Sequence, residues 1–387
     1  MKLEGVKVLD LSQFLPGPHL TMMMADHGAE VIKIEPPTGE PVREVGLRQN
    51  GHSVWFRNTH RNKRCIVLNL KVDAARDVFL RLARSADVIV EAFRPGVVER
   101  LGIGYEAVRA VNPRIVYCSI SAFGQTGPAA HKPAHDLAVQ AQAGLVSVNL
   151  GQDGLPAMPA LPAADMAASL MALTGILMAL YRRERTGQGD YLDIAMHDAL
   201  LAWTPNVMGP PFAEDRAPVV KDERSWGGGA FYQLYRTADG TTLALGGAEH
   251  KFVQNLLGAL QRPDLIPAAM QPPGPAHEPV RVFLRATFAS KTLAQWSVFL
   301  DALDVAWSPV RTLHEAVTSE LVLARGMRVE QPAGQPHLGI PIKFQSEPGV
   351  LDGRLDEIGA STEVVLRECG YLDAELAALR AAGAMPE

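Results

Sequence analysis

Two short segments of the chain carry side chains that can take up and release protons. His135 stands beside Asp136, and thirty residues later Asp165 precedes the most apolar run of the sequence, residues 166–180. A histidine changes its protonation near neutral pH, and an apolar setting disfavours the charged form of a carboxyl group. The two segments therefore offer two acid–base groups in a poorly hydrated place. A simpler interpretation is that Asp165 caps the helix that follows it and that His135 is an ordinary loop or core residue.

Alternating strand and helix patterns in the first half of the chain indicate the scaffold for these groups. The predicted strands comprise residues 6–11, 29–35, 65–70, 86–91, 115–120 and 191–195, and the helices between them include residues 19–27, 73–85 and 166–180. This alternation favours the α/β class with an open parallel sheet, in which ligands bind at the carboxyl ends of the strands. The turn Pro16-Gly17-Pro18 after the first strand lacks the Gly-x-Gly-x-x-Gly pattern, which argues against a nicotinamide-dependent dehydrogenase.

The segment of residues 36–64 is polar and irregular. Its basic side chains are Arg43, Arg48, Arg57, Arg61, Lys63 and Arg64. One interpretation is a solvated loop, and the other is a set of cationic groups that bind phosphates.

The second half of the chain begins with residues 205–224, which are rich in proline and charge and which we interpret as a domain boundary. A strand is predicted at residues 241–246, and helices are predicted at residues 251–260, 281–289 and 293–303. Residues 325–349 have an extended pattern, and residues 357–382 are mostly helical.

Composition excludes several classes of function. With 47% hydrophobic and 20% charged residues among 387, the chain is typical of a soluble globular protein. The net charge of −5 without a long basic block gives no indication of nucleic-acid binding. Three cysteines, far apart, form no disulfide or metal pattern, so we expect a cytoplasmic setting without a signal peptide. Residues 163–180 approach transmembrane length but contain polar residues, and we expect a buried helix and no membrane partner.

A series of short sequences lies along nearly the whole chain, and their combination is specific although each piece is common. They are residues 5–10, 16–18, 28–35, 62–71, 86–88, 93–96, 124–128 and 185–189. Together they resemble the class III CoA-transferase family (CaiB/BaiF type), which also contains α-methylacyl-CoA racemases.

The resemblance implies an interlocked homodimer. Each chain would have a large Rossmann-like α/β domain from residues 1–204 and 325–387, with a smaller α+β domain of residues 205–324 inserted between them. It also implies that an acyl-CoA is the substrate, with no tightly bound cofactor and no metal. The residues that we expect to contact CoA are Lys33, Arg64, Arg94, Arg100 and Asp136.

The catalytic pattern resembles α-methylacyl-CoA racemase most closely. Racemases in the family combine an aspartate base with a histidine followed by Asp and with a glutamate in the smaller domain. Here Asp165, His135 and Glu249 match these three positions, and Glu249 ends the segment of residues 246–249 that resembles the racemase glutamate segment. We therefore expect a racemase or epimerase of 2-methylacyl-CoA thioesters that moves the α-proton with two bases. Glu249 is expected to pair with His135, orient it and make it more basic on one face of the α-carbon, while Asp165 acts on the other face. Backbone N–H groups at the start of the Asp165 helix are the expected donors to the enolate oxygen.

Two alternatives remain open. In the first, the chain is a CoA-transferase, and Asp165 attacks the thioester and forms an aspartyl intermediate. Residues 137–142 and Gln13 favour this alternative, and residues 227–229 would then be a glycine loop that covers the intermediate, although a hinge or turn explains them as well. In the second alternative, the chain binds acyl-CoA without catalysis.

Overall fold

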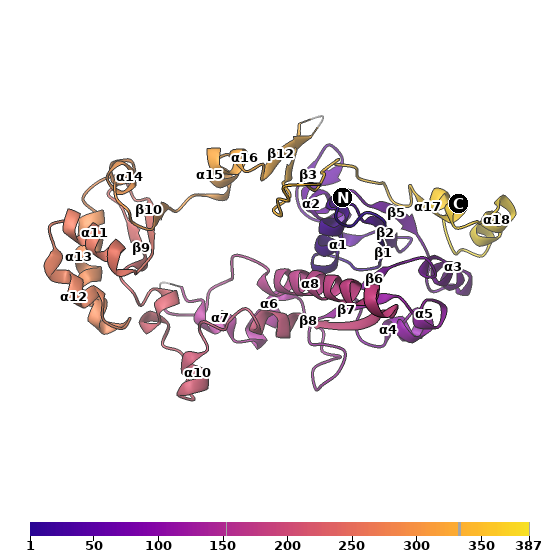
Figure 1. Cartoon of the computed structure of the whole chain (residues 1–387), viewed down its shortest axis with the longest axis horizontal. Helices are drawn as coiled ribbons and strands as arrows, with labels where there is room; N and C mark the ends of the chain where they lie inside the picture. Colours follow the sequence, from indigo (N-terminus) through magenta and orange to yellow (C-terminus); the bar gives the residue numbers. More distant parts are fainter. Residues whose placement is uncertain (152, 332–333, 387) are drawn as a thin grey trace. The chain divides into compact units, whose positions relative to one another are not determined.

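The structure is a computed structural model that describes residues 1–151, 153–331 and 334–386. The chain divides into two compact units. Unit 1 comprises Met1–Ala143, Pro159–Trp203 and Thr318–Glu387, and unit 2 comprises Gly144–Met158 and Thr204–Val317. Both ends of the chain belong to unit 1 (Figure 1). The predicted domain boundaries after residues 204 and 324 stay predictions, because compactness within one chain does not show that a unit folds alone.

A six-stranded parallel sheet forms the centre of unit 1, which confirms the predicted α/β sheet. Its strands lie in the order β5-β2-β1-β6-β7-β8. Their bounds are β1 Lys7–Asp10, β2 Glu30–Glu35, β5 Arg64–Val67, β6 Val88–Glu91, β7 Val116–Ser121 and β8 Asp190–Ala195. The inner strands are rich in Val and Ile because helices cover both faces of such a sheet.

The strand order reverses between β1 and β6. From β1 the chain runs outward to β2 and β5 on one side, and then returns to β6 on the other side of β1. At such a reversal the loops after the two central strands diverge and leave a crevice at their carboxyl ends. The topology therefore places a ligand site after Asp10 and Glu91.

The longest helix, α8 (Ala163–Thr186), is long and apolar enough to span a membrane by length and composition. It packs against β7, β8, α1 and α9, and small residues such as Ala164, Ala168 and Ala172 are fully buried along it. We therefore identify α8 as a core helix. Its outer side exposes Leu170, Met171, Leu177, Met178 and Tyr181.

Unit 1 contains further helices besides α8. Their bounds are α1 Pro16–Asp26, α2 Val54–His60, α3 Asp73–Ala83, α4 Val97–Arg100, α5 Tyr105–Val111, α6 Asp136–Gln142, α9 Met196–Leu201, α16 Glu320–Ala324, α17 Thr362–Glu368 and α18 Asp373–Ala381. Two small hairpins accompany them, β3 Arg48–Gln49 with β4 His52–Ser53 and β12 Arg328–Gln331 with β13 Gln335–Leu338.

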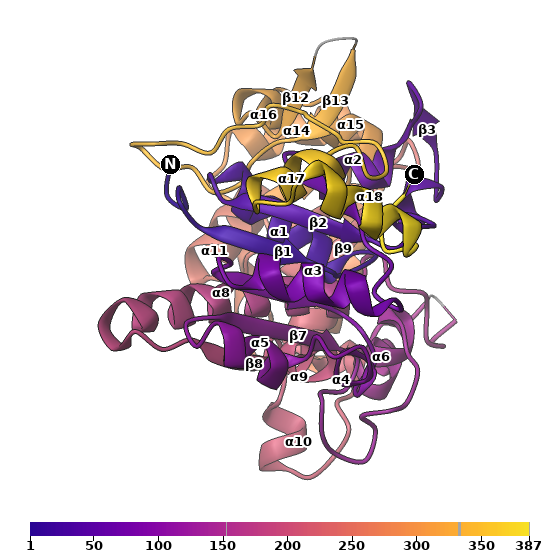
Figure 2. The same cartoon turned by 90° about the vertical axis from the view of Figure 1, so that its right-hand side faces the viewer.

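The C-terminal segment lies against the edge strand β5 of the sheet. Figure 1 shows α17 beside β5, and Figure 2 shows α17 and α18 at the end of the sheet next to β2. The N–H of Val67 donates to Thr362 Oγ1 at 3.0 Å, and the N–H of Cys65 donates to Asp356 Oδ2 at 3.0 Å. In return, the carbonyl of Cys65 accepts from Ser361 N–H at 3.0 Å. Backbone groups that β5 would otherwise leave unpaired at the edge of the sheet are thus hydrogen-bonded to residues nearly three hundred positions later.

The polar segment of residues 36–64 differs from the prediction. Its basic side chains Arg43, Arg57, Arg61 and Lys63 are buried, so a solvated loop is wrong for them. Three of the four pair with buried carboxylates at short range: Arg43–Glu35 at 2.6 Å, Arg61–Asp26 at 2.7 Å and Lys63–Asp10 at 3.0 Å. These pairs tie the segment to β1, α1 and β2, because a buried charge is stable only with a partner.

Unit 2 has a three-stranded antiparallel sheet, in the order β11-β10-β9, and a group of helices. The strands are β9 Tyr232–Arg236, β10 Thr242–Gly246 and β11 Trp307–Pro309. The helices are α7 Leu145–Val148, α10 Gly209–Ala213, α11 His250–Ala259, α12 Ile266–Ala269, α13 Glu278–Phe288, α14 Leu293–Asp301 and α15 Leu313–Val317. Its separate core includes Phe231, Leu256, Phe288, Trp296 and Leu300.

Candidate functional site

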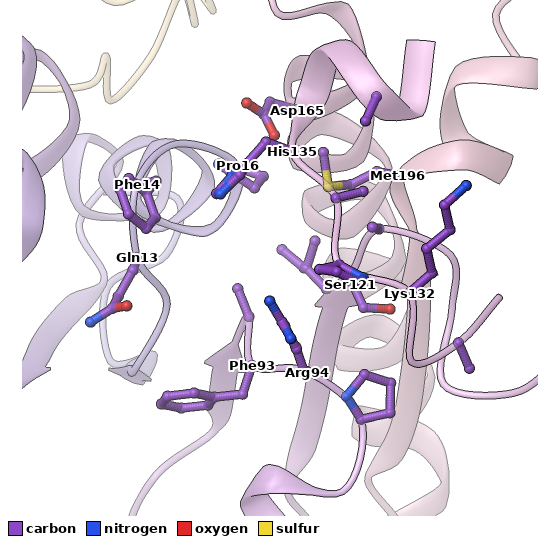
Figure 3. A pocket seen from close by; sticks show the side chains of 18 of the residues that line it. Gln13, Phe14, Pro16, Phe93, Arg94, Ser121, Lys132, His135, Asp165 and Met196 are labelled. Atoms are coloured by element: carbon purple, nitrogen blue, oxygen red, sulfur yellow. The ribbon is translucent and has the colours of Figure 1, made fainter. Parts of the chain in front are cut away.

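A cavity of about 740 Å³ opens in unit 1 at the carboxyl ends of β1, β6, β7 and β8. It lies where the strand order reverses. The loop after β1 contributes Gln13 and Phe14, the loop after β6 contributes Arg94, and residues further along contribute Ser121, Lys132, His135, Asp165 and Met196 (Figure 3). The two predicted acid–base groups of unit 1, His135 and Asp165, therefore line one pocket.

Asp165 is the third residue of α8 and is half-buried in the pocket wall. Burial, as the larger cause, and the nearby negative charge of Asp136 together raise the pKa of its carboxyl group to about 7. Both causes act on the charged form, the first by removing water and the second by repulsion. Near neutral pH Asp165 can therefore be either ionised or protonated.

Asp136 holds the start of α8. Its Oδ1 accepts the N–H groups of Ala164 at 2.8 Å and Asp165 at 3.1 Å, and its Oδ2 accepts from Gln140 Nε2 at 2.6 Å. Asp136 is the first residue of α6, so one carboxylate joins the starts of two helices. Its predicted contact with CoA stays a prediction, and its observed partners are those of a helix cap.

The predicted source of donors to an enolate oxygen is wrong. Besides the two amides that bind Asp136, Ala163 N–H donates to Leu161 at 2.9 Å and Met166 N–H donates to Pro162 at 3.1 Å. The amides of the first turn of α8 are thus already paired within the protein. Donors to a reacting oxygen must come from elsewhere.

His135 directly precedes α6 and is exposed at the pocket. The ring of Phe14 meets it edge to face, with ring centroids 5.8 Å apart at 78°. An aromatic edge-to-face contact at this distance restricts the orientation of the imidazole. The loop after β1 thus contributes to the position of a residue that is more than a hundred positions away.

Glu249 lies in unit 2. It is exposed and directly precedes α11. Its predicted pairing with His135 joins residues of different units and stays a prediction.

The predicted CoA contacts fall in different places. Arg94 is exposed and lines the pocket, and Arg100 is exposed at the end of α4. Arg64 begins β5 and so lies at the opposite, amino end of the sheet, where it binds Glu30 at 3.0 Å and Glu368 at 2.7 Å.

Lys33 lies in β2 and is buried to 1% exposure. Its ammonium group is 3.2 Å from Glu40 and 3.8 Å from Asp10. In this chain its observed partners are carboxylates of the interior. The contacts of all these residues with CoA stay predictions, and Arg94 has the placement that fits best.

Lys132 and Phe14 are pocket residues that were not selected from the sequence as functional residues. Lys132 opens the sequence that leads to His135, and its ammonium group is 5.7 Å from the centre of the Phe123 ring. Phe14 stands in the turn Gln13–Pro18, which the sequence marks only as lacking a nucleotide pattern. The signal for Lys132 was its closeness to His135, whereas an aromatic residue in a turn carries no such signal.

The glycine segment of residues 227–229 is held firmly within unit 2. Arg281 donates to the carbonyl of Gly228 at 2.6 Å, and the N–H of Gly228 donates to Glu223 at 2.9 Å. Gln233 donates to the carbonyl of Gly227 at 2.8 Å. The next residue, Ala230, donates its N–H to the buried His277 at 3.1 Å. A loop that must open and close over an intermediate would have to break these bonds.

Comparisons with known proteins agree on one family. The sequence profile described as CoA-transferase family III matches residues 3–359. An acetyl-CoA:oxalate CoA-transferase from Acetobacter aceti is 33% identical over 376 residues, which cover 92% of this chain and 94% of that protein. The α-methylacyl-CoA racemase of Homo sapiens is 32% identical over 384 residues, which cover 97% of this chain and 95% of that protein. The crystal structure of a CaiB/BaiF family protein from Brucella suis matches with a TM-score of 0.82 at 28% identity, and covers 95% of this chain and 99% of that chain.

Most of the relatives compared here are named CoA-transferases, and one is a racemase. The identity to the racemase is nevertheless about as high as the identity to the transferases. The comparisons therefore favour CoA transfer, the first alternative from the sequence, over the racemisation that the sequence suggested as the main activity.

Proposed function

This chain belongs to CoA-transferase family III and is an acyl-CoA enzyme, and from this we propose that it moves CoA between two carboxylic acids through a covalent intermediate on Asp165. The observation that carries the proposal is the half-buried carboxyl group of Asp165 in the wall of the pocket, with a pKa of about 7. A carboxylate that water solvates poorly is more basic and more nucleophilic than an exposed one. Most of the relatives compared above are CoA-transferases by name, which supports the same chemistry.

In the proposed reaction, the Asp165 carboxylate attacks the thioester carbonyl of the donor. The carbon–sulfur bond breaks, CoA leaves as a thiolate, and a mixed anhydride forms. The thiolate then attacks the carbonyl carbon of Asp165, so that the donor carboxylate leaves and an aspartyl-CoA thioester remains. The acceptor carboxylate then attacks the aspartyl-CoA thioester, CoA leaves again as a thiolate, and a second mixed anhydride forms. The thiolate attacks the carbonyl carbon of the acceptor in this anhydride, so that the new acyl-CoA forms and Asp165 leaves as a free carboxylate.

The basic side chains of the pocket have a role in this scheme. Each step places a negative charge on sulfur or on a carboxylate while Asp165 is covalently occupied. Arg94, Lys132 and His135 line the same pocket and can offset that charge. CoA would enter as part of the substrate, and the cytoplasmic setting and the interlocked homodimer belong to the same proposal.

Racemisation of a 2-methylacyl-CoA is the second candidate, because His135 and Asp165 line one pocket. In that reaction one of the two groups removes the α-proton, the thioester becomes an enolate, and the other group returns a proton to the opposite face. The bonds that hold residues 227–229 favour this candidate as well, since they leave little freedom for a covering loop.

One experiment separates the candidates. The enzyme is incubated with a 2-methylacyl-CoA and a free carboxylic acid in deuterated water, with and without hydroxylamine. CoA transfer to the acid, inactivation by hydroxylamine and a hydroxamate on the peptide that contains Asp165 support the transferase. Rapid α-deuteration with loss of chirality, and no hydroxamate, supports the racemase. Binding of the thioester with neither reaction contradicts both.

Replacing His135 by Gln gives a second separation of the two chemistries. A racemase should lose about a hundredfold or more in the rate of α-exchange, which is the usual worth of a general acid–base group. A transferase should still form the adduct on Asp165, because the imidazole is not the nucleophile. Asp165→Asn is the matched control and should abolish both activities.

A further inference from the structure

Phe14 has a backbone conformation that is unusual for its residue type. Its φ is 65°, in the left-handed region. The other non-glycine residues with positive φ in the described part of the chain are Asn50, Asn62, Asp215, Gln261 and Glu347, all with polar side chains. A bulky aromatic residue in this region is strained, and such strain persists only where the surroundings impose it. The strained residue here stands in the wall of the pocket.

The bond that imposes the conformation comes from Glu40. The N–H of Phe14 donates to Glu40 Oε1 at 2.9 Å. Glu40 is 2% exposed, and its own N–H donates to Glu35 Oε2 at 3.0 Å, which fixes its backbone. A buried carboxyl group that is paired with a lysine, as Glu40 is with Lys33, makes a stronger hydrogen bond than a neutral acceptor does.

Lys33, which pairs with Glu40, holds the turn at a second point. Lys33 lies 3.2 Å from Glu40, and it also donates to the carbonyl of Ser12. Asp10, at the end of β1, completes the group at 3.8 Å from Lys33. The turn after β1 is therefore held at the carbonyl of Ser12 and at the N–H of Phe14, on either side of Gln13.

The held turn directs the Phe14 ring toward the site. The edge-to-face contact with His135, at 5.8 Å and 78°, is the result (Figure 3). We propose that Glu40 is a positioning residue of the site: through the N–H of Phe14 it sets the Phe14 ring against His135 and so fixes one wall of the acyl pocket. The effect on substrate rests on the function proposed above, whereas the effect on His135 does not.

The first test uses nuclear magnetic resonance of histidine ring protons in protein with isotope-labelled histidine. The His135 signals are identified as those that disappear in His135→Asn. Because the ring current of Phe14 shifts these signals, Phe14→Ala should move them. Glu40→Asp keeps the negative charge beside Lys33 but withdraws the acceptor from Phe14 by one methylene. It should move the His135 signals in the same direction as Phe14→Ala.

Two further variants complete the test. Glu40→Gln keeps an acceptor in place and should return the His135 signals toward those of the wild type. Glu44→Asp is the matched control, because Glu44 lies four residues later and pairs with Arg48 at the surface. It should leave the signals unchanged. Wild-type His135 signals in folded Glu40→Asp would overturn the proposal.

Kinetics add a readout that a purely structural role would not give. Glu40→Asp should lower kcat/KM for the acyl-CoA by about tenfold, which corresponds to one charge-assisted hydrogen bond. Glu40→Gln should recover part of this loss at an unchanged thermal unfolding temperature. Equal losses in both variants, in parallel with their loss of stability, would contradict a positioning role even if the His135 signals move.

Discussion

Asp165 shows how much a single residue depends on distant neighbours. The sequence places a carboxyl group before an apolar helix, and the expected rise in its pKa is found, with burial as the main cause. What the sequence could not show is the second cause. Asp136, whose contact with CoA stays a prediction, accepts two amides of the first turn of α8, and only the fold brings the start of α6 against the start of α8.

The pH dependence of the reaction tests this arrangement. Asp165 acts in its ionised form, so kcat/KM should rise with pH through about 7. Asp136→Asn removes the like charge but keeps an acceptor for the two amides. Since repulsion by Asp136 raises the pKa of Asp165, the rising limb should move to lower pH in this variant.

The measurement is the pH profile of kcat/KM for the wild type and for Asp136→Asn. Asp190→Asn serves as the control, because Asp190 is exposed at the amino end of β8, opposite the pocket. A limb that stays in place in Asp136→Asn, or that moves equally in the control, contradicts the explanation.

At the scale of elements, alternation predicted the six strands of the sheet and the helices α1, α3 and α8, because buried parallel strands leave clear apolar runs. The short helices α5 and α9 were not predicted. The same method failed for residues 36–64. A charged residue is expected to be exposed unless the sequence shows a partner of opposite charge. Here the partners of Arg61 and Arg43 are Asp26 in α1 and Glu35 in β2. The helix α2 was missed for the same reason. The glycine segment has the same kind of dependence, since Arg281 and His277 lie about fifty residues away.

Gly228 provides a test of how firmly that segment is held. A Cβ at this position would lie 2.5 Å from the carbonyl carbon of Asp222, which is backbone and cannot turn aside. Gly228→Ala should therefore lower the free energy of unfolding by about 1–3 kcal/mol, as overpacking usually does.

The matched control is Gly258→Ala in α11, where nothing lies within 4 Å of the added Cβ. Alanine favours a helix, so this variant should be neutral or more stable by about 0.5–1 kcal/mol. Denaturant unfolding followed by tryptophan fluorescence measures both, since Trp296 lies in the core of unit 2. Equal stability of the two variants would show that the segment yields easily.

At the scale of the whole molecule, the sequence predicted that the chain returns to its first domain, but only through a family resemblance. No local pattern in residues 354–384 indicates that they form hydrogen bonds with the backbone of β5, because bonds between distant segments leave no periodic pattern in the sequence. The exposed side of α8 is a similar case. Its apolar residues were predicted to be buried, yet Met178 and Leu177 are 66% and 41% exposed.

A second copy of the chain is the partner we expect for that surface. Light scattering after size-exclusion chromatography should give twice the 41.8 kDa of one chain. Met178→Glu should shift the protein toward the monomer, because a charge at an apolar interface must be desolvated. Val298→Glu, at a residue that is 77% exposed in unit 2, is the control and should leave the mass unchanged. A wild-type mass of one chain contradicts the expected dimer.

The bonds between β5 and the C-terminal segment have a consequence for biosynthesis. A ribosome releases β5 early, but Asp356, Ser361 and Thr362 are made only after nearly three hundred further residues. Until then β5 is an exposed edge strand of the nascent sheet, and its unpaired N–H groups can form hydrogen bonds with other extended chains. The edge of the sheet at β5 can therefore be covered only once residues 356–362 have been made, and a molecular chaperone that shields this edge until then should raise the yield of folded protein.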